Sequence, residues 1–160
     1  MSPYDPGESQ ATLLGDRDPI VVLQATPTRL AELAESLGED GLELPYGQGK
    51  WRRREVIAHM ADVELATSFR LRQTVADPGS TYVTYDQDVW AQHYGRLSAA
   101  LALEAFRALR AWNLAWLSTL SLQDWLAEGM HPERGPMDVD RLVRFLAAHD
   151  LNHLEQLERR

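Results

Sequence analysis

The stretch that decides the fold runs from residue 138 to residue 158 and reads DVDRLVRFLAAHDLNHLEQLE. Its apolar residues recur every three or four positions, which is typical of one face of an α-helix. These residues are Val139, Leu142, Val143, Leu146, Leu154 and Leu157. The same stripe passes through His149 and His153, so both imidazoles are predicted to face the core, with Cβ atoms roughly 5–6 Å apart. Two imidazoles placed in this way can hold one metal ion.

Three more segments carry an apolar stripe at helical spacing. Residues 18–38 begin with Asp-Pro, a helix start, and are predicted to end at Gly38, with Pro27 kinking or splitting the helix. Residues 51–76 form the second helix. Residues 98–120 form the third, which is predicted to bury Leu101, Ala105, Ala108, Leu109, Trp112, Trp116 and Leu120.

Between these helices the sequence predicts loops and no sheet, because no segment shows a convincing run of alternating apolar and polar residues. Residues 79–95 form a long loop with one short helical turn around 88–94, and residues 121–137 form a second long loop. Four amphipathic helices in one chain predict an all-α four-helix bundle. Residues 1–160 therefore make a single domain, in which 1–16 are expected to be an irregular arm.

Composition excludes several classes of protein. The chain has no cysteine, which excludes disulfides, zinc fingers, iron–sulfur clusters and a cysteine nucleophile; a metal must be held by His, Asp, Glu, water or backbone. The net charge of -8 opposes binding to nucleic-acid phosphates, and the basic run at 52–54 is short. The start MSPYDPGESQ is unlike a signal peptide, and no apolar stretch is long enough to span a membrane. We therefore expect a cytoplasmic protein that binds neither nucleic acid nor membranes.

The third histidine of the candidate metal site is His59, on the apolar face of residues 51–76. A buried imidazole must satisfy two ring nitrogens, which is difficult for neighbouring inward-facing histidines without a metal. Three neutral nitrogens suit Zn, Ni, Fe or Cu and leave a coordination position open. The alternative is that all three are hydrogen-bonded core residues. Asp62 and Asp150 are candidates to accept hydrogen bonds from the far ring nitrogens, or else surface carboxylates, while Glu64 is assigned to the surface or to an interhelical ion pair.

Aromatic and acidic residues gather in the long loop at 79–95. They could roof a pocket, for which Tyr85, Asp86 and Trp90 are the candidates, or they could simply pin the loop by their own rings. The remaining aromatic residues of this group are Tyr82 and Tyr94. His93 and His131, in the two long loops, are predicted to be solvent-exposed or gating residues rather than metal ligands.

Three motifs are GKWRRREVIAHMADVE at 49–64, YDQDVWAQHY at 85–94 and HPERGPMDVDRLVRFLAAHDLNHLEQL at 131–157. Together they resemble the DinB/YfiT-like superfamily of metal-binding four-helix bundles. The resemblance implies that His59, His149 and His153 bind a divalent metal, with Zn or Ni foremost. It also implies an up-down-down-up order of helices, frequent homodimers, and residues 79–95 as the crossover between helices two and three. The chain departs from the family at residues 52–54, where a Ser or Thr cap is usual.

The resemblance leaves three functions open. The first is a metal-dependent transferase that joins a low-molecular-weight thiol, supplied as a cosubstrate, to an electrophile; a metal can hold such a thiol as thiolate. The second is a metal-dependent hydrolase of a small-molecule substrate, for which Asp62, Asp86 or Asp88 would have to serve as the general base. The third is a non-catalytic, stress-related protein with a structural metal.

Overall fold

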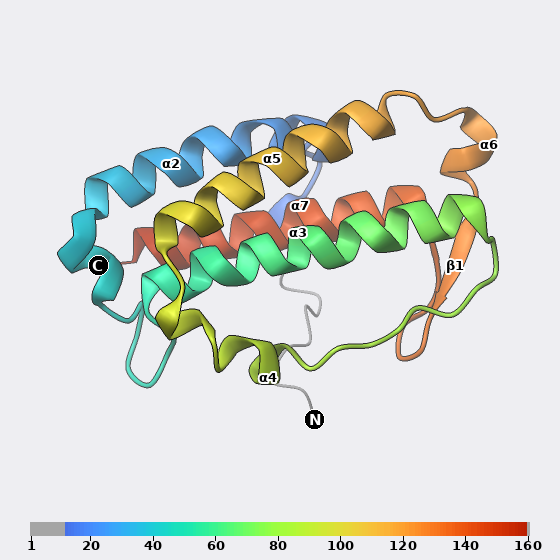
Figure 1. The fold of residues 1–160 in the computed structure, drawn as a ribbon. Helices are drawn as coiled ribbons and strands as arrows, with labels where there is room; N and C mark the ends of the chain where they lie inside the picture. Colours follow the sequence, from blue (N-terminus) through green and yellow to red (C-terminus); the bar gives the residue numbers. More distant parts are fainter. Residues whose placement is uncertain (1–11, 160) are drawn as a thin grey trace.

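The computed structural model describes residues 12–159 and contains four long helices. They are α2 (Pro19–Glu43), α3 (Arg53–Ala76), α5 (Ala99–Leu117) and α7 (Val139–Glu158). Figure 1 shows that α2 and α7 run in one direction, whereas α3 and α5 run in the other. Both α2 and α3 pack against α5 and α7. The predicted four-helix bundle with up-down-down-up order is confirmed.

Two positions of helix α2 bear on the sequence prediction. Pro27 does not split it. The missing N–H of this proline leaves the carbonyl of Leu23 without its helical donor, and the guanidinium of Arg110 donates to that carbonyl at 3.0 Å instead. At Gly38 the helical backbone is interrupted, as predicted: this glycine has φ +62°, and after the kink a second helical stretch continues as far as Glu43.

The start of α3 shows how the chain manages without a Ser or Thr cap. The carboxylate of Glu55 accepts a hydrogen bond from the backbone N–H of Arg52 at 2.8 Å, and it also pairs with the Arg52 guanidinium at 3.0 Å. This interaction satisfies one of the unpaired donors of the first turn. Arg52 in turn pairs with Glu43 at the end of α2, which ties the two helix ends together.

The connection between α3 and α5 returns along the outside of the bundle, as Figure 1 shows. It contains α4 (Gln87–Ala91) and a 3₁₀ helix (Tyr94–Arg96). Asp86 caps α4, because its carboxylate accepts hydrogen bonds from the N–H groups of Asp88 and Val89 at 2.9 and 3.2 Å. The crossover predicted between helices two and three is thus present, with its short helical turn.

The prediction of no sheet was wrong, because a β-hairpin lies between α6 (Leu122–Trp125) and α7. Strands β1 (Glu128–His131) and β2 (Gly135–Asp138) pair antiparallel. Each has four residues and contains a glycine, so neither shows an alternating pattern long enough to recognise. The backbone N–H of Tyr82 donates to the carbonyl of Met130 at 2.9 Å, which joins the crossover to the hairpin.

The face that α5 buries also differs from the prediction. Its buried residues are Phe106, Arg110, Asn113 and Leu117. Leu101 and Trp112, predicted to be in the core, are 66% and 64% exposed. The apolar stripe pointed to the wrong face because the true core face carries an arginine and an asparagine. Exposed apolar residues on α5 offer a surface for self-association, but the homodimer stays a prediction.

The apolar core consists of two clusters with polar side chains between them. One cluster, nearer the hairpin, includes Leu23, Val63, Leu117, Leu142 and Leu146. The other includes Leu30, Ile57, Phe106, Leu154 and Leu157. The buried polar residues between them are Thr26, His59, Glu64, Arg110, Asn113, His149, Asp150 and His153. This polar layer crosses all four long helices, so the functional candidates lie in the middle of the bundle.

The N-terminal arm predicted at residues 1–16 falls largely outside the described residues, which begin at Thr12. Residues 12–14 are helical, and Leu14 packs in the apolar core at 5% exposure. Within residues 12–159, none of the helices combines the length and the apolar character needed to cross a membrane.

Candidate metal centre

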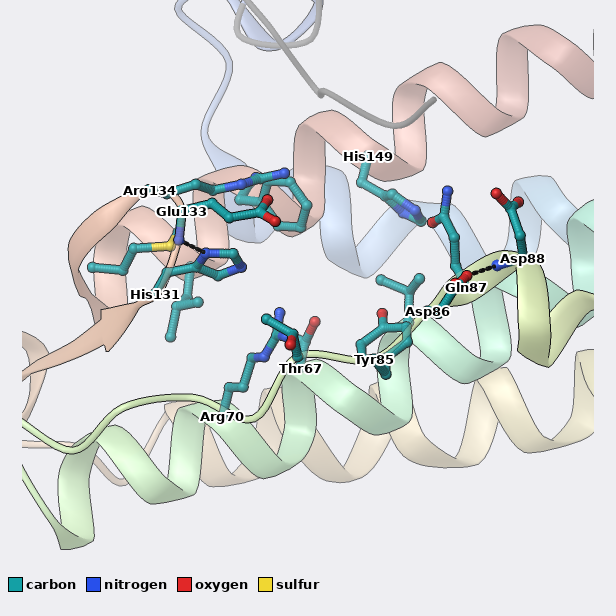
Figure 2. Close-up of a pocket in the computed structure, with 15 residues that line it drawn as sticks. Thr67, Arg70, Tyr85, Asp86, Gln87, Asp88, His131, Glu133, Arg134 and His149 are labelled. Atoms are coloured by element: carbon teal, nitrogen blue, oxygen red, sulfur yellow. Dashed lines mark hydrogen bonds between the residues drawn. The ribbon is translucent and has the colours of Figure 1, made fainter. Parts of the chain in front are cut away.

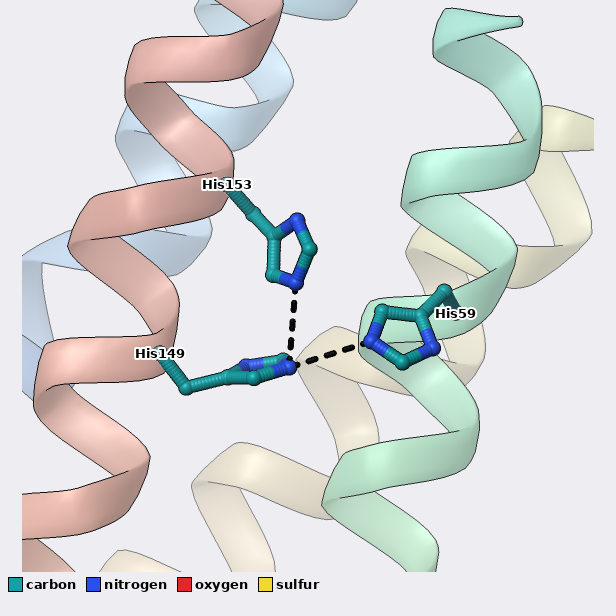
Figure 3. A group of neighbouring side chains, drawn as sticks. All are labelled: His59, His149 and His153. Carbon is teal, nitrogen blue, oxygen red and sulfur yellow. Dashed lines mark hydrogen bonds between the residues drawn. The ribbon is translucent and has the colours of Figure 1, made fainter. Parts of the chain in front are cut away.

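Three imidazoles meet between α3 and α7. Figure 3 shows His59 on α3 facing His149 and His153, which lie one turn apart on α7. Nε2 of His149 lies 3.1 Å from Nε2 of His59 and 3.1 Å from Nε2 of His153. One ligand atom from each ring lies within 4.8 Å of the others, and each histidine is 1% exposed. The helical spacing of the sequence therefore produces a compact cluster of three nitrogens.

The contacts among these nitrogens fit a metal ion better than they fit hydrogen bonds alone. Nε2 of a neutral imidazole either carries one hydrogen or offers one lone pair. Nε2 of His149 faces two ring nitrogens at the same distance, so it cannot form two linear hydrogen bonds with them. Three nitrogens bound to one metal at about 2.1 Å in tetrahedral geometry lie about 3.4 Å apart, close to the observed spacing. The donor set fits a divalent metal such as Zn or Ni.

Gln156 fixes the ring of His153. Its side-chain oxygen lies 2.8 Å from Nδ1 of His153 and must accept the hydrogen of that nitrogen, because an amide oxygen is only an acceptor. Nδ1 therefore carries the hydrogen, and the lone pair of Nε2 points to the other two histidines. Sequence analysis missed this residue, although its position three residues after His153 is where a helical neighbour of that ring is expected.

Burial keeps all three imidazoles neutral. It lowers the pKa of His59 and His149 well below the usual range, and the neighbouring His153 adds to this effect in both cases. Burial also lowers the pKa of His153 to about 4, although the hydrogen bond to Gln156 acts in the opposite direction. Neutral imidazoles are the form that binds metals, so the cluster is ready for a metal at neutral pH.

A pocket of about 520 Å³ reaches the cluster at His149. Figure 2 shows its walls, which come from α3, the crossover, the hairpin turn and α7. Its lining residues are Val63, Thr67, Arg70, Thr84, Tyr85, Asp86, Gln87, Asp88, His131, Glu133, Arg134, Met137, Leu142, Phe145 and His149. Of the predicted pocket residues, Tyr85 and Asp86 line it. Trp90 lies behind Tyr85, with the two rings stacked at 4.3 Å.

The loop histidines and the other tyrosines take separate places. His131 is 9% exposed and lines the pocket, so it is more buried than the sequence suggested, while His93 is exposed. Nδ1 of His131 accepts a hydrogen bond from the backbone N–H of Glu133 at 3.2 Å. Tyr82 and Tyr94, both 2% exposed, pin the crossover to the bundle. The aromatic group therefore both forms a pocket wall and anchors its loop.

Comparison with known proteins places this architecture in a family. The sequence profile of the DinB superfamily matches residues 23–157. The chain belongs to the DinB superfamily. Among its DinB relatives, "Putative metal-dependent hydrolase YfiT" of Bacillus subtilis is 25% identical over 163 residues, which cover 98% of this chain and 91% of YfiT. "Putative metal-dependent hydrolase OB0782" of Oceanobacillus iheyensis is 26% identical over 136 residues, covering 84% and 79% of the two chains.

The fold of this DinB protein also matches a solved structure. YfiT from Bacillus subtilis, described as "a probable metal-dependent hydrolase with an unusual four-helix bundle topology", superimposes with a TM-score of 0.82 at 20% identity. The match covers 98% of this chain and 87% of the YfiT chain. The relatives named as metal-dependent and the buried three-histidine cluster together support metal binding in this DinB protein.

Asp62 and Asp150, the predicted hydrogen-bond acceptors for the histidine rings, contact other side chains of the DinB bundle. A carboxylate oxygen of Asp62 accepts the hydroxyl hydrogen of Tyr94 at 2.8 Å, which holds the end of the crossover against α3. Asp150 is 1% exposed and pairs with Arg110 at 2.7 Å. Neither carboxylate is a free surface group, and each anchors a structural element that carries or covers the site.

Arg110 is the centre of a buried charge network that sequence analysis did not anticipate. It donates to Asp150 on α7 at 2.7 and 3.2 Å and to Glu64 on α3 at 2.8 Å, and all three residues are at most 1% exposed. The other Glu64 oxygen accepts from Asn113 at 2.7 Å. Because Arg110 also donates to Leu23 on α2, one guanidinium joins all four long helices. The ion-pair role considered for Glu64 is the one observed.

Proposed function

We propose that this protein is a metal-dependent transferase that joins a low-molecular-weight thiol to an electrophilic small molecule. The observation that carries the proposal is the position of the three-histidine cluster at the wall of a pocket of about 520 Å³, reached through His149. A structural metal site is closed by four protein ligands, whereas three ligands beside a small-molecule pocket leave a position for a reactant.

A bound divalent metal would lower the pKa of a thiol at the open position and favour its thiolate. His59, His149 and His153 would hold that metal without adding negative charge, so its full charge would act on the sulfur. In the reaction the thiol proton goes to solvent, the sulfur forms a bond to the carbon of the electrophile, and the leaving group departs with the electron pair of the broken bond. The pocket walls would hold the two reactants side by side and orient them.

His131 is suited to donate a hydrogen bond in this pocket and not to accept a proton. Its Nδ1 accepts from the backbone of Glu133, so in the neutral ring Nε2 carries the hydrogen. Burial, with the nearby charges of Arg70 and Arg134, lowers the pKa of His131, so this ring is a poor proton acceptor. Ionisation of a metal-bound thiol, whose free pKa is about 8.5, would not require His131 as a base.

A metal-dependent hydrolase is the second candidate, because the relatives YfiT and OB0782 carry that name. The carboxylates of Asp86 and Asp88 line the pocket and are the available general bases for a metal-activated water. The pocket would then hold one substrate instead of two. Thiol dependence separates the two reactions.

The experiment begins with the metal content of the purified, untagged protein, of His149→Ala/His153→Ala and of His93→Ala, measured by mass spectrometry. We expect about one metal per chain in the parent protein and in His93→Ala, an exposed histidine outside the cluster, and none in the double variant. Metal-loaded protein is then assayed with monochlorobimane and a panel of cellular thiols. Absence of turnover with every thiol rejects the transferase; turnover of ester or amide substrates without thiol supports the hydrolase.

A further inference from the structure

Two arginines reach the pocket from different elements. Arg70 lies on α3, and Arg134 lies in the turn between the two strands of the hairpin. Figure 2 shows Arg70 extending from α3 toward His131, while Arg134 crosses the top of the same space. Asp86 and Asp88 lie at the other end, near His149. The pocket therefore has a basic end, which is separate from the end that touches the metal site.

Aromatic rings support both guanidinium groups. The guanidinium carbon of Arg70 lies 5.5 Å from the ring centres of Tyr82 and Tyr85, and that of Arg134 lies 4.8 Å from the ring centre of Phe145. A cation–π contact of this kind attracts a guanidinium to the ring but does not neutralise its charge.

Arg70 differs from the arginines that form ion pairs with carboxylates. Arg29, Arg52, Arg54, Arg110 and Arg144 all form salt bridges with carboxylates. Arg70 forms none with any carboxylate in residues 12–159, and its one side-chain hydrogen bond is to the carbonyl of Val83 at 3.3 Å. A partly buried guanidinium beside a pocket, without an anionic partner from the protein, points to an anionic ligand.

The electrostatic effects of the two arginines overlap. The positive charges of Arg70 and Arg134 both contribute to lowering the pKa of His131, after burial as the larger cause. Both also oppose the rise in the pKa of Tyr85 that burial causes. Glu133, which is exposed but also lines the pocket beside Arg134, acts in the opposite direction on His131. Two guanidinium groups and one carboxylate therefore act on this end of the pocket, which keeps a net positive charge.

We propose that Arg70 and Arg134 form an oxyanion subsite that binds a carboxylate or phosphate group of the small-molecule substrate. The neutral ring of His131 faces the same subsite and adds its Nε2–H as a third donor. A substrate anchored there by its anionic end extends through the pocket toward His149, which places its reactive group at the metal. The location of the reactive end rests on the proposed function; the anion subsite itself does not.

Binding of inorganic phosphate and of succinate, measured by isothermal titration calorimetry, tests the subsite and distinguishes the two anions. Succinamide serves as the neutral analogue. The measurements use metal-loaded protein and are repeated after metal removal, because either anion can also coordinate a metal. We expect at least one anion to bind with or without metal, and succinamide not to bind. Arg70→Gln and Arg134→Gln should each weaken anion binding about ten-fold or more, since charge-assisted hydrogen bonds are lost.

Arg107→Gln is the matched control, because Arg107 is exposed on α5 and does not line the pocket. This substitution changes the net charge by the same amount as Arg70→Gln and Arg134→Gln do. Arg70→Lys keeps the charge but loses the two-pronged geometry, and it should bind more weakly than the parent. Circular dichroism verifies that each variant is folded. The proposal is overturned if the parent protein binds neither anion, or if Arg70→Gln and Arg134→Gln bind as Arg107→Gln does.

Competitive inhibition by the same anions connects the subsite to catalysis. In whichever reaction the metal-loaded protein performs, the inhibition constant should rise about ten-fold in Arg70→Gln and stay unchanged in Arg107→Gln. Inhibition that is insensitive to Arg70 would overturn the subsite while the enzymatic activity stands. Conversely, anion binding that depends on Arg70 and Arg134, in a protein without thiol-dependent turnover, would retain the subsite and reject the transferase.

Discussion

Replacing Arg110 by methionine should be among the most destabilising single changes in this protein. The guanidinium is 1% exposed and pairs with Glu64 and Asp150, which are 0% and 1% exposed. Methionine fills much of the same volume without a charge. The substitution therefore leaves two carboxylates in the core without their cation, and it removes the donor from the carbonyl of Leu23.

The expected size of the effect follows from this geometry. Breaking a buried ion pair by removing one partner costs about 3–5 kcal/mol, because the remaining charge stays buried without compensation. Here one substitution breaks two ion pairs, so the free energy of unfolding should fall by at least the lower end of that range. For a domain of this length about 1 kcal/mol corresponds to about 2–4 °C, so the midpoint of thermal unfolding should fall by about 6–20 °C.

Urea unfolding of metal-free protein, followed by circular dichroism, measures the loss directly. Arg107→Gln, an exposed change on the same helix, should stay within about 0.5 kcal/mol of the parent. The triple variant Glu64→Gln/Arg110→Met/Asp150→Asn has no buried charge in the network and should recover a large part of the loss. A loss below about 1 kcal/mol in Arg110→Met, or no recovery in the triple variant, would refute this account of the network.

Three other substitutions test separate parts of the structure. Gly129→Ala should lose about 1–3 kcal/mol in urea unfolding, because a Cβ there would lie 2.5 Å from ring carbons of the buried Tyr82; a neutral result would contradict the close packing. Gln156→Ala should weaken zinc binding about 10–100-fold in competition with a chelator, since it frees the ring of His153; unchanged affinity would reject that role. Burial raises the pKa of Asp62, so its charged form is disfavoured in the folded state. Asp62→Asn should therefore have a larger free energy of unfolding than the parent at pH 7. The difference in this free energy should shrink as the pH falls through the raised pKa toward about 3.9, the ordinary pKa of Asp. A difference that grows as the pH falls would contradict burial as the cause.

The histidine cluster could be predicted because local geometry alone determines most of it. His149 and His153 follow the spacing of the apolar residues on α7, so the amphipathic pattern that predicts the helix also predicts where the rings point. His59 lies among the buried residues of α3 in the same way. Only the packing of α3 against α7 had to be supplied by the bundle fold.

The core face of α5 could not be predicted by the same reasoning. Periodicity assumes that the buried face is the apolar one, but α5 buries Arg110 and Asn113 and exposes Leu101 and Trp112. The reason lies on other helices, where Glu64 and Asp150 supply the partners that make a buried arginine tolerable. An isolated helix sequence does not contain that information.

The sequence predicted only the wall of the pocket that the crossover forms, because the other walls depend on contacts between distant segments. Tyr85 and Asp86 come from the crossover, whereas Arg70 comes from α3 and Arg134 from a hairpin that the sequence did not reveal. The hairpin is held in place by backbone hydrogen bonds to the crossover around Tyr82. Such pairing between distant segments leaves no periodic pattern, so the basic end of the pocket became visible only in the structure.

The histidine cluster and the charge network each use one of two neighbouring residues on α7, and this explains why a polar layer is retained in the core. His149 faces α3 and the pocket, while Asp150, the next residue, faces Arg110 on α5. Replacing the network by apolar residues would often be neutral or favourable for stability alone. Its value is in fixing the rotation of α7 and α3 relative to each other, since Glu64 on α3 binds the same guanidinium. Metal ligands held on two helices need that fixed rotation more than they need extra stability, because small displacements of a ligand weaken a metal site.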